Sequence, residues 1–519
     1  MGHAHRGGFC AGCGHGATRR EFVRGCGAAL AAAGGLAPGP SRAEDKKKTP
    51  VRIGLVFLST DRPSWPSPEF DVAGRQKEIL ALLSEGCPGV EFVPVAVHSN
   101  AEANKATALK DRVDGYLVYI VTLAWRLRGA LMAVAKLGKP LIVADEYLGG
   151  SGLFLTGYSA LRRAGIPAVG VASTRPGDLV VAARCFASLR EPGTTPASFA
   201  KRCQQAYRKT FPPAGELECR DDEVSLTDIG KCVERFRQAR FLIVGRGHAG
   251  RKHDFLGAEG IYVGFDELKA LYEKADREEA AQWADRWIKE AEQVVEAKPD
   301  WIRKAAAIYL ATRKLCERYE TDTVTMNCLG GFASGRLPAY PCLGFMQILN
   351  DGGHGVCEAM PDDTLSMLIG RILTGRPGYV SDPVLDTAKN QVVYAHCVAT
   401  TKVFGPDGEA NSFRIRTLHN HDPRGTCAQS FLPKGYMTTS FRTSFRRKQM
   451  VIHRAKAVGN LDSPRGCRTQ LVGEVSGDIG NLFGEWDRFG WHRVTVYGDV
   501  KEPLIEFAKA LGLAVVEEG

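Results

Sequence analysis

Residues 51–58 read Val51-Arg-Ile-Gly-Leu-Val-Phe-Leu58, a short apolar run that indicates a strand buried on both faces of a sheet. Four more such runs follow it, at residues 90–97, 115–122, 140–144 and 168–172. Stretches with a helical pattern separate them, at residues 74–84, 124–137 and 153–164. This alternation of strand and helix predicts a doubly wound α/β domain.

A second α/β unit begins at the apolar run of residues 241–244, after a polar helical region. Helical patterns follow at residues 277–296 and 300–319, with Pro299 between them, and at residues 363–373. The chain is therefore α/β in class over its first two thirds, with a predicted first domain at 51–238 and a second at 239–375.

The hydrophobic period changes after Gly375-Arg-Pro-Gly378, where alternating segments separated by turn residues take over. They lie at residues 391–398, 412–418, 436–441 and 450–457. A final strand, helix and strand are predicted within residues 491–516. These patterns predict a β-rich C-terminal domain at 376–519.

The N-terminus has the pattern of a twin-arginine export signal. Arg19-Arg20 precede an apolar run at 28–37, and Ala43 closes a small-residue cleavage site. The run is roughly ten residues, against the ~20 needed to span a bilayer. We therefore expect a signal peptide at 1–43, a linker at 44–50, a periplasmic or other extracytoplasmic location, and no stable membrane anchor after cleavage. The alternative is a basic, disordered N-terminus.

Composition is that of a globular protein, with 44% hydrophobic and 24% charged residues among 519. Removing residues 1–43 takes away five Arg and one Glu and leaves a formal charge of +6. No basic stripe with interleaved aromatic residues is visible, so a nucleic-acid partner is not expected. Of the 15 Cys, 12 follow Ala43, scattered along the chain, which indicates free thiols rather than a disulfide framework.

Gly245-x-Gly247-x-x-Gly250 has the spacing of a dinucleotide fingerprint, and Asp266 lies downstream where a ribose ligand is expected. The residues after Gly250 do not have the apolar face that the required helix needs. A plain turn between a strand and a helix is the alternative interpretation, and we expect no nucleotide cofactor. A nucleotide-dependent oxidoreductase remains a minor hypothesis.

Histidines gather in the C-terminal domain. His396 ends an apolar strand, and His419 and His421 are two apart, which places them on one face of a strand. Glu358 lies upstream, just before a helix. Imidazoles with a carboxylate are a ligand set for Mn²⁺, Zn²⁺ or Fe²⁺. Ordinary half-buried histidines bonded to the backbone are the alternative.

Several of these stretches resemble the L-fucose isomerase and L-arabinose isomerase superfamily. They are Leu337–Gly344 continuing to Val356-Cys357-Glu358, residues 373–382, Tyr394-Ala-His396-Cys397, and residues 492–499. The resemblance implies two Rossmann-like domains followed by a barrel-like C-terminal domain. It also implies aldose–ketose isomerisation of a sugar or sugar derivative, a divalent metal (commonly Mn²⁺), and a homo-oligomer.

The resemblance also implies roles for single residues. His396 matches a metal ligand, His421 matches the second histidine, His419 is a further candidate, and Glu358 matches a carboxylate at the metal. In such enzymes the metal polarises the carbonyl of an open-chain sugar. Two carboxylates then move a proton between C1 and C2 through an enediol.

The sequence departs from the family at two places. Met360 stands where relatives have Asp, two residues after Glu358, and Asp351 is the only nearby substitute for a second, upstream carboxylate. Asp362 and Asp363 begin a helix and are expected to point elsewhere. A non-catalytic carbohydrate-binding relative is therefore the alternative to an isomerase.

Overall fold

The computed structural model describes residues 50–60, 69–418, 422 and 424–519, and Pro50–Gly519 form one compact unit. The predicted signal peptide lies outside the described residues, as does all of the predicted linker except Pro50. Among the helices of the described ranges, none combines the length and the apolar character that crossing a membrane requires.

The first sheet consists of five parallel strands in the order β2-β1-β3-β4-β5. Their bounds are β1 Val51–Leu58, β2 Val90–Val97, β3 Gly115–Ile120, β4 Leu141–Asp145 and β5 Ala168–Val171. All five predicted strands of this region are confirmed. The order reverses between β1 and β3, where the chain moves to the other side of β1.

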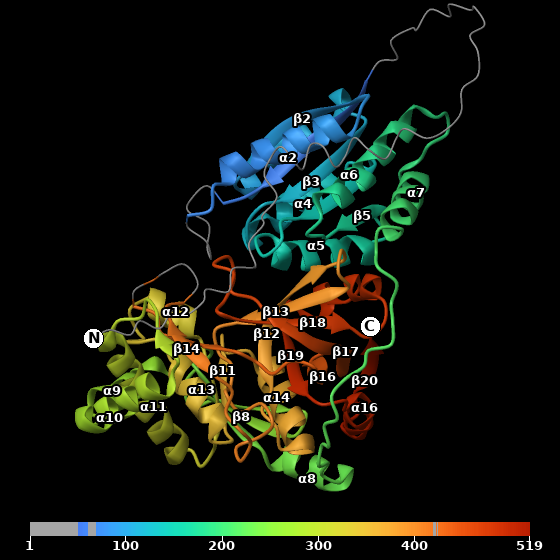
Figure 1. Ribbon diagram of the computed structural model, residues 1–519. Helices are drawn as coiled ribbons and strands as arrows, with labels where there is room; N and C mark the ends of the chain where they lie inside the picture. The colour runs from blue at the N-terminus through green and yellow to red at the C-terminus, as the bar shows by residue number, and fades with distance from the viewer. Residues whose placement is uncertain (1–49, 61–68, 419–421, 423) are drawn as a thin grey trace, which may run out of the picture. The chain divides into compact units, whose positions relative to one another are not determined.

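Helices cover both faces of this sheet because its strands are apolar on both sides. Ile53 and Leu55 pack into the core on the side of α2 (Val72–Gly86), and Val56 packs into the core on the side of α5 (Ser151–Arg163). Figure 1 shows α2 and α5 on opposite faces of the sheet. Successive strand residues point to opposite faces, so the continuous apolar run feeds both cores.

The second sheet has the order β11-β10-β6-β8-β7, and only β7 runs antiparallel to its neighbour. Its strands are β6 Arg240–Val244, β7 Lys252–Phe255, β8 Ala258–Val263, β10 Thr323–Met326 and β11 His354–Cys357. The mixed α/β class is thereby confirmed. The helix predicted at 277–296 is too long: α10 (Arg277–Glu290) ends early because Gln293–Val294 form β9, which pairs with β14 (Phe413–Arg416).

The glycine motif after β6 does not open a helix. Gly245, Gly247 and Gly250 have φ of 78°, 67° and 81°, and the chain continues directly into β7. A Cβ at Gly245 would lie 2.1 Å from the Phe265 ring, so this turn needs glycine for close packing as well as for its backbone angle. The structural context of a dinucleotide fingerprint is therefore missing.

The C-terminal region is rich in strands, as predicted. They are β12 Tyr379–Asp386, β13 Gln391–His396, β16 Met437–Ser444, β17 Gln449–Asn460, β18 Thr469–Val475, β19 Arg493–Tyr497 and β20 Ala514–Glu517. Their order is β16-β19-β12-β13-β18-β17-β20, and β16 also pairs with β17, so six antiparallel strands pair in a ring. The Rossmann-like and barrel-like details and the domain bounds stay predictions.

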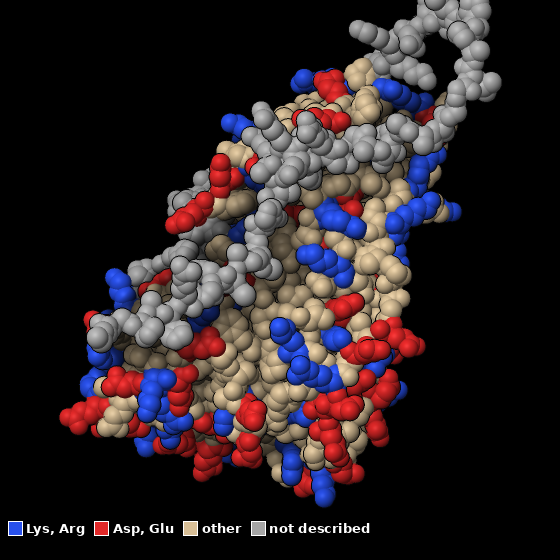
Figure 2. All heavy atoms as spheres, viewed as in Figure 1, with Lys and Arg blue, Asp and Glu red and all other residues tan. Residues whose placement is uncertain are grey.

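Helix α14 (Pro361–Thr374) packs between the second sheet and the ring. Leu365 and Ile369 lie in one core with Phe441 of β16 and Val494 of β19. This packing holds the carboxyl end of β11 close to the ring strands. On the face shown in Figure 2, acidic and basic side chains are interspersed over the described surface.

Candidate active site and metal-binding cluster

Three donor side chains meet where β11 ends against the ring: Glu358, Asp382 and His492. The Nε2 atom of His492 lies 3.1 Å from Asp382 Oδ1 and 3.7 Å from Glu358 Oε2. Asp382 and His492 are buried, whereas the Glu358 side chain keeps 31% of its surface exposed. Two carboxylates thus converge on one imidazole nitrogen at a point that solvent reaches.

Strand register brings these residues together from distant parts of the sequence. Asp382 of β12 pairs with Ala395 of β13, and Ser381 pairs with Arg493 of β19. Asp382 therefore lies between the strand that ends in His396 and the strand that His492 precedes. The rings of His396 and His492 lie 5.5 Å apart and nearly perpendicular. Donor atoms of Glu358, His396 and His492 all lie within 4.8 Å of one another.

Glu358 sits in unusual backbone geometry. Its φ is 68° and that of Ala359 is 51°, in the left-handed region that residues other than glycine rarely adopt. Such conformations cost on the order of 1–3 kcal/mol each and gather at functional sites. The backbone N–H of Met360 donates to Thr325 Oγ1 at 3.2 Å and fixes the end of this turn. This turn directs the Glu358 carboxylate toward His492 at the edge of the strand ring.

A buried ion network orients His492 from behind. Its Nδ1 lies 2.6 Å from Asp363 Oδ2, and Arg442 Nε donates to Asp363 Oδ1 at 2.6 Å. The sequence-based expectation that Asp363 points away from the site is wrong. Asp363 lies in the first turn of α14, and its side chain points toward the strand ring because Arg442 and His492 both offer it hydrogen bonds. With Nδ1 engaged, Nε2 is the nitrogen that faces Glu358 and Asp382.

The charges of this network shift the pKa values of its members. Burial opposes ionisation of Asp363, but Arg442 and His492 outweigh it and hold the pKa of Asp363 well below its ordinary value. Burial likewise opposes protonation of His492, but Asp363 and Asp382 raise its pKa well above the usual range. Burial, followed by repulsion from Asp382, raises the pKa of Glu358 against the attraction of His492.

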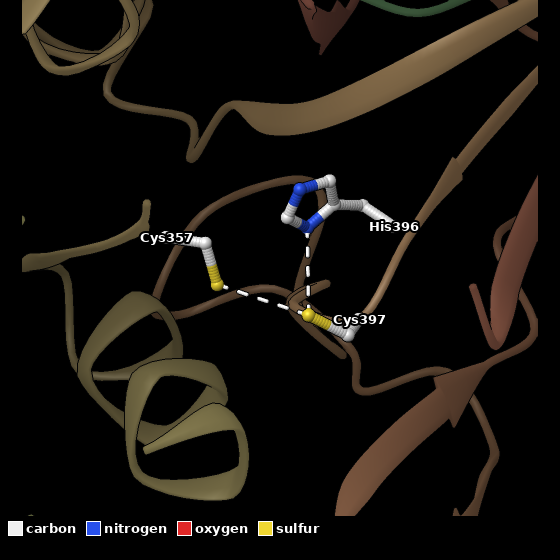
Figure 3. A group of neighbouring side chains, drawn as sticks. All are labelled: Cys357, His396 and Cys397. Atoms are coloured by element: carbon white, nitrogen blue, oxygen red, sulfur yellow. Dashed lines mark hydrogen bonds between the residues drawn. The ribbon is translucent and has the colours of Figure 1, made fainter. Parts of the chain in front are cut away.

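Next to this centre lies a candidate metal-binding cluster of Cys357, His396 and Cys397, shown in Figure 3. Cys397 Sγ lies 3.8 Å from Cys357 Sγ and 3.7 Å from His396 Nδ1. Cys342 Sγ, from α13 (Cys342–Asn350), lies 3.8 Å from Cys397 Sγ on another side. Zn–S bonds of about 2.3 Å at tetrahedral angles place neighbouring sulfurs roughly 3.8 Å apart, so the thiols have ligand spacing.

His396 faces both groups. Its Nδ1 contacts Cys397, and a donor atom of the same ring lies near Glu358 and His492. Burial opposes protonation of His396, but the neighbouring Cys397 raises its pKa to about 9. The thiols of Cys342 and Cys357 donate to Cys397 and hold its pKa well below the ordinary value. The imidazole thus links a carboxylate-lined centre to a thiol-lined one.

Asp351, the other predicted catalytic residue, lies away from this centre. Asp351 precedes β11, whereas Glu358 follows it, and a four-residue strand separates the two by about 13 Å. The exposed Asp351 carboxylate accepts hydrogen bonds from Tyr309 and Gln347, away from His492. His419 and His421 lie outside the described residues.

Asp382 and His492 are the members that sequence reasoning did not assign. Both stand in stretches that resemble the sugar isomerases, at the end of residues 373–382 and the start of residues 492–499. The clue in the sequence was that an acid, Asp382, and a histidine, His492, stand at the ends of the stretches that resemble sugar isomerases. The pairing of β12 with β19, which brings them together, is not visible in the sequence.

Comparison with known proteins places the chain near sugar isomerases. It is 26% identical over 318 residues to a sulfoquinovose isomerase from Clostridium sp. (strain MSTE9), covering 58% of this chain and 66% of that protein. It is 26% identical over 274 residues to a sulfoquinovose isomerase from Priestia aryabhattai, covering 51% and 60%. The chain thus spans about three fifths to two thirds of these relatives' length.

No family model matches the chain. The predicted similarity to sugar isomerases is confirmed at the level of this class by the two relatives. The more specific resemblance to L-fucose and L-arabinose isomerases stays a prediction.

Proposed function

We propose that this protein is a metal-assisted aldose–ketose isomerase that acts on a sugar or sugar derivative. The observation that carries the proposal is the convergence of Glu358 and Asp382 on Nε2 of His492. The similarity to sulfoquinovose isomerases supports the reaction class. Two carboxylates at one point are what proton transfer between adjacent sugar carbons requires.

The donor set suits a divalent cation such as Mn²⁺. Asp382 Oδ1 is buried and lies 3.1 Å from Nε2 of His492, so both donor atoms would meet a cation that took the place of the proton between them. Carboxylate oxygens combined with imidazole form a ligand set that Mn²⁺ accepts. Glu358, Asp382 and His492 would hold the ion, with His396 as a further ligand. Bound there, it would polarise the carbonyl and adjacent hydroxyl of an open-chain sugar.

The residues of the chain supply the remaining chemistry. Glu358 is the part-exposed member, so its carboxylate is the group that a substrate can reach. Its raised pKa suits a group that accepts a proton from one carbon and returns it to the next through an enediol. Asp382 supplies the second carboxylate. Asp363 holds the imidazole of His492 in place, as carboxylates behind metal-binding histidines do.

A non-catalytic sugar-binding protein is the second candidate. The observation that favours it is Met360, since the thioether cannot take a proton or bind a hard cation where the sugar isomerases carry Asp. Replacing Met360→Asp tests it. A variant that gains turnover with unchanged sugar affinity would favour a site that has lost activity, whereas an active wild type would exclude this candidate.

Export and assembly belong to the same proposal. We propose that the twin-arginine segment directs the folded, metal-loaded protein out of the cytoplasm, that the mature chain keeps no stable membrane anchor, and that it forms a homo-oligomer. Cleavage after Ala43 would be seen as an N-terminus at Glu44 in protein recovered from the extracytoplasmic fraction.

The decisive experiment measures metal content and isomerase activity in the same samples. Wild type should contain about one divalent ion per chain and convert aldoses to ketoses when Mn²⁺ is added. His492→Ala should lose both ion and activity while keeping its circular dichroism spectrum. A folded wild type that takes up no Mn²⁺ and converts no sugar of an aldose panel would overturn the proposal.

A further inference from the structure

A cleft of about 770 Å³ opens beside Met360, at the carboxyl edge of the second sheet. Its walls come from the turn after β6, the segment after β11, strands β7 and β8, and the loop after β16. Open α/β sheets bind their ligands at this edge, outside the carboxyl ends of the strands. Glu358 ends β11 at the same edge, directly before the cleft residues Ala359 and Met360.

The cleft carries an excess of positive charge. The exposed side chains of Arg246, Arg251 and Arg446 line it, and none of them forms an ion pair with any described residue. Among the described residues of the lining, Asp362 supplies the one carboxylate, and it accepts a hydrogen bond from the backbone N–H of Phe445. Three guanidinium groups therefore line the cavity without a carboxylate partner among the described residues, and the weak contact of Arg246 with the Met360 sulfur does not neutralise its charge.

A second cavity of similar size differs in how its arginines are paired. The cavity of about 760 Å³ beside Arg240 also contains arginines, but Arg240 pairs there with Glu259 and Glu320. Its described lining holds two arginines and three carboxylates, whereas the lining beside Met360 holds four arginines and one carboxylate. An unbalanced arginine cluster is a site for an anion.

The walls of the cleft are aromatic. The rings of His253 and Phe255 lie 4.5 Å apart, and Phe255 lies 4.8 Å from Phe445. Such a low-polarity floor beneath guanidinium groups strengthens hydrogen bonds to an oxyanion. Met360 adds no negative charge, and its sulfur lies 3.9 Å from Arg246 Nη1.

The cleft also communicates with the candidate active site. Arg442 lines it, and the same guanidinium bonds Asp363, which holds His492. A ligand in the cleft is thus one side chain away from the network that orients the candidate metal ligand. We propose that Arg246, Arg251 and Arg446 bind a tetrahedral oxyanion, a sulfonate or a phosphate, carried by the sugar substrate. This inference rests on the proposed function.

Calorimetry on the full chain tests the binding step, with methanesulfonate and inorganic phosphate as probes. Arg246→Ala and Arg251→Ala should each weaken binding of the preferred probe at least about tenfold, since bonds between charged groups are the strong ones. Arg240→Ala, which removes an arginine that is already paired with Glu259 and Glu320, should leave it unchanged. Undiminished binding in both cleft variants, or no binding of either probe to wild type, would overturn the proposal.

Kinetics with a sulfonated hexose (sulfoquinovose), glucose 6-phosphate and glucose tests the role in substrate choice. The anionic sugar of the preferred class should show a KM that rises about tenfold in Arg246→Ala with kcat within about twofold, because the contact is remote from the reacting carbons. Equal KM values for glucose and both anionic sugars would overturn the inference while leaving the isomerase proposal intact.

The two proposals can fail separately. Probe binding that depends on Arg246 and Arg251 in a protein that converts none of the three sugars would support the anion site and contradict the isomerase. Comparison of the two probes also tells which anionic group the substrate carries. A site for sulfonated sugars binds methanesulfonate more tightly than phosphate, whereas a site for sugar phosphates binds phosphate more tightly.

Discussion

Asp363 Oδ2 lies 2.6 Å from Nδ1 of His492, so a fully buried carboxylate sets the orientation of the imidazole whose other nitrogen meets Glu358 and Asp382. Asp363 is in turn held by Arg442. The candidate centre is therefore supported from behind by a buried ion pair, and its properties depend on Asp363 and Arg442 as well as on the donor residues themselves.

Asp363→Asn should weaken Mn²⁺ binding roughly 10- to 100-fold, because the neutral amide no longer fixes the imidazole or raises its basicity. Titration calorimetry measures this directly. Asp362→Asn is the matched control on the same helix turn, and it should bind Mn²⁺ as wild type does. Equal affinities in the two variants would show that Asp363 acts on stability alone.

Asp382→Asn should lower kcat by roughly 10²–10⁴, the range that loss of a positioned proton-transfer group or of a metal-binding carboxylate produces. Asp351→Asn should keep wild-type kcat, because the structure places this carboxylate beside Tyr309 and Gln347. Steady-state assays of the two variants side by side decide between the carboxylate expected from sequence and the one found at His492.

The thiol cluster should prefer a soft cation, since thiolates bind Cd²⁺ and Zn²⁺ more tightly than Mn²⁺. Cys397→Ser should reduce Cd²⁺ affinity by on the order of tenfold or more, followed through the ultraviolet thiolate-to-cadmium absorption. Cys316→Ser, a buried cysteine of α11 (Pro299–Arg318), is the control. If both variants bind Cd²⁺ equally, the cluster is only a packed group of thiols.

Glu518 should stabilise the protein through buried pairing with Arg493 and His453. Burial opposes its charge, but Arg493 outweighs burial and lowers its pKa from 4.5 to about 2. Glu518→Gln should cost about 3–5 kcal/mol of unfolding free energy at neutral pH, since it leaves the buried Arg493 unpaired. Glu517→Gln, at a half-exposed ion pair with Lys501, should cost less than about 1 kcal/mol.

The lowered pKa of Glu518 predicts that the free energy of unfolding depends on pH. Because the folded pKa lies below the unfolded one, the stabilisation is complete above about pH 4.5 and is lost as the pH falls toward 2. Denaturant unfolding at pH 7 and pH 3 should therefore show a larger loss for wild type than for Glu518→Gln. Parallel losses in the two proteins would contradict the depressed pKa.

The first sheet could be predicted strand by strand, because parallel strands buried on both faces are continuous apolar runs such as residues 51–58. The element after Gly245-x-Gly247-x-x-Gly250 could not be predicted, since glycine spacing fixes a turn but does not decide whether a helix or a strand such as β7 follows it. The helix predicted at 277–296 is longer than α10, because the pairing of Gln293–Val294 with β14 overrides the local helical pattern.

Half of the candidate site followed from the sequence and half did not. Glu358 and His396 were identified, and the structure brings their donor atoms together. Asp382 and His492 depend on which strands pair in the ring, and the thiols depend on how α13 packs against β11. Residues at such contacts carry no local pattern, so their roles appear only once the strand order is known.

Asp382, His396 and His492 come from three strands of the ring or their ends, and Glu358 follows β11, so the complete binding site forms only when the ring has closed and β11 has docked on it. Contacts between segments so far apart in sequence close late in folding. A chain that is still being synthesised has no place to hold the cation, and its uptake marks completed folding. For a protein exported in the folded state, as proposed, the choice of metal is made in the cytoplasm and carried outside with the cargo.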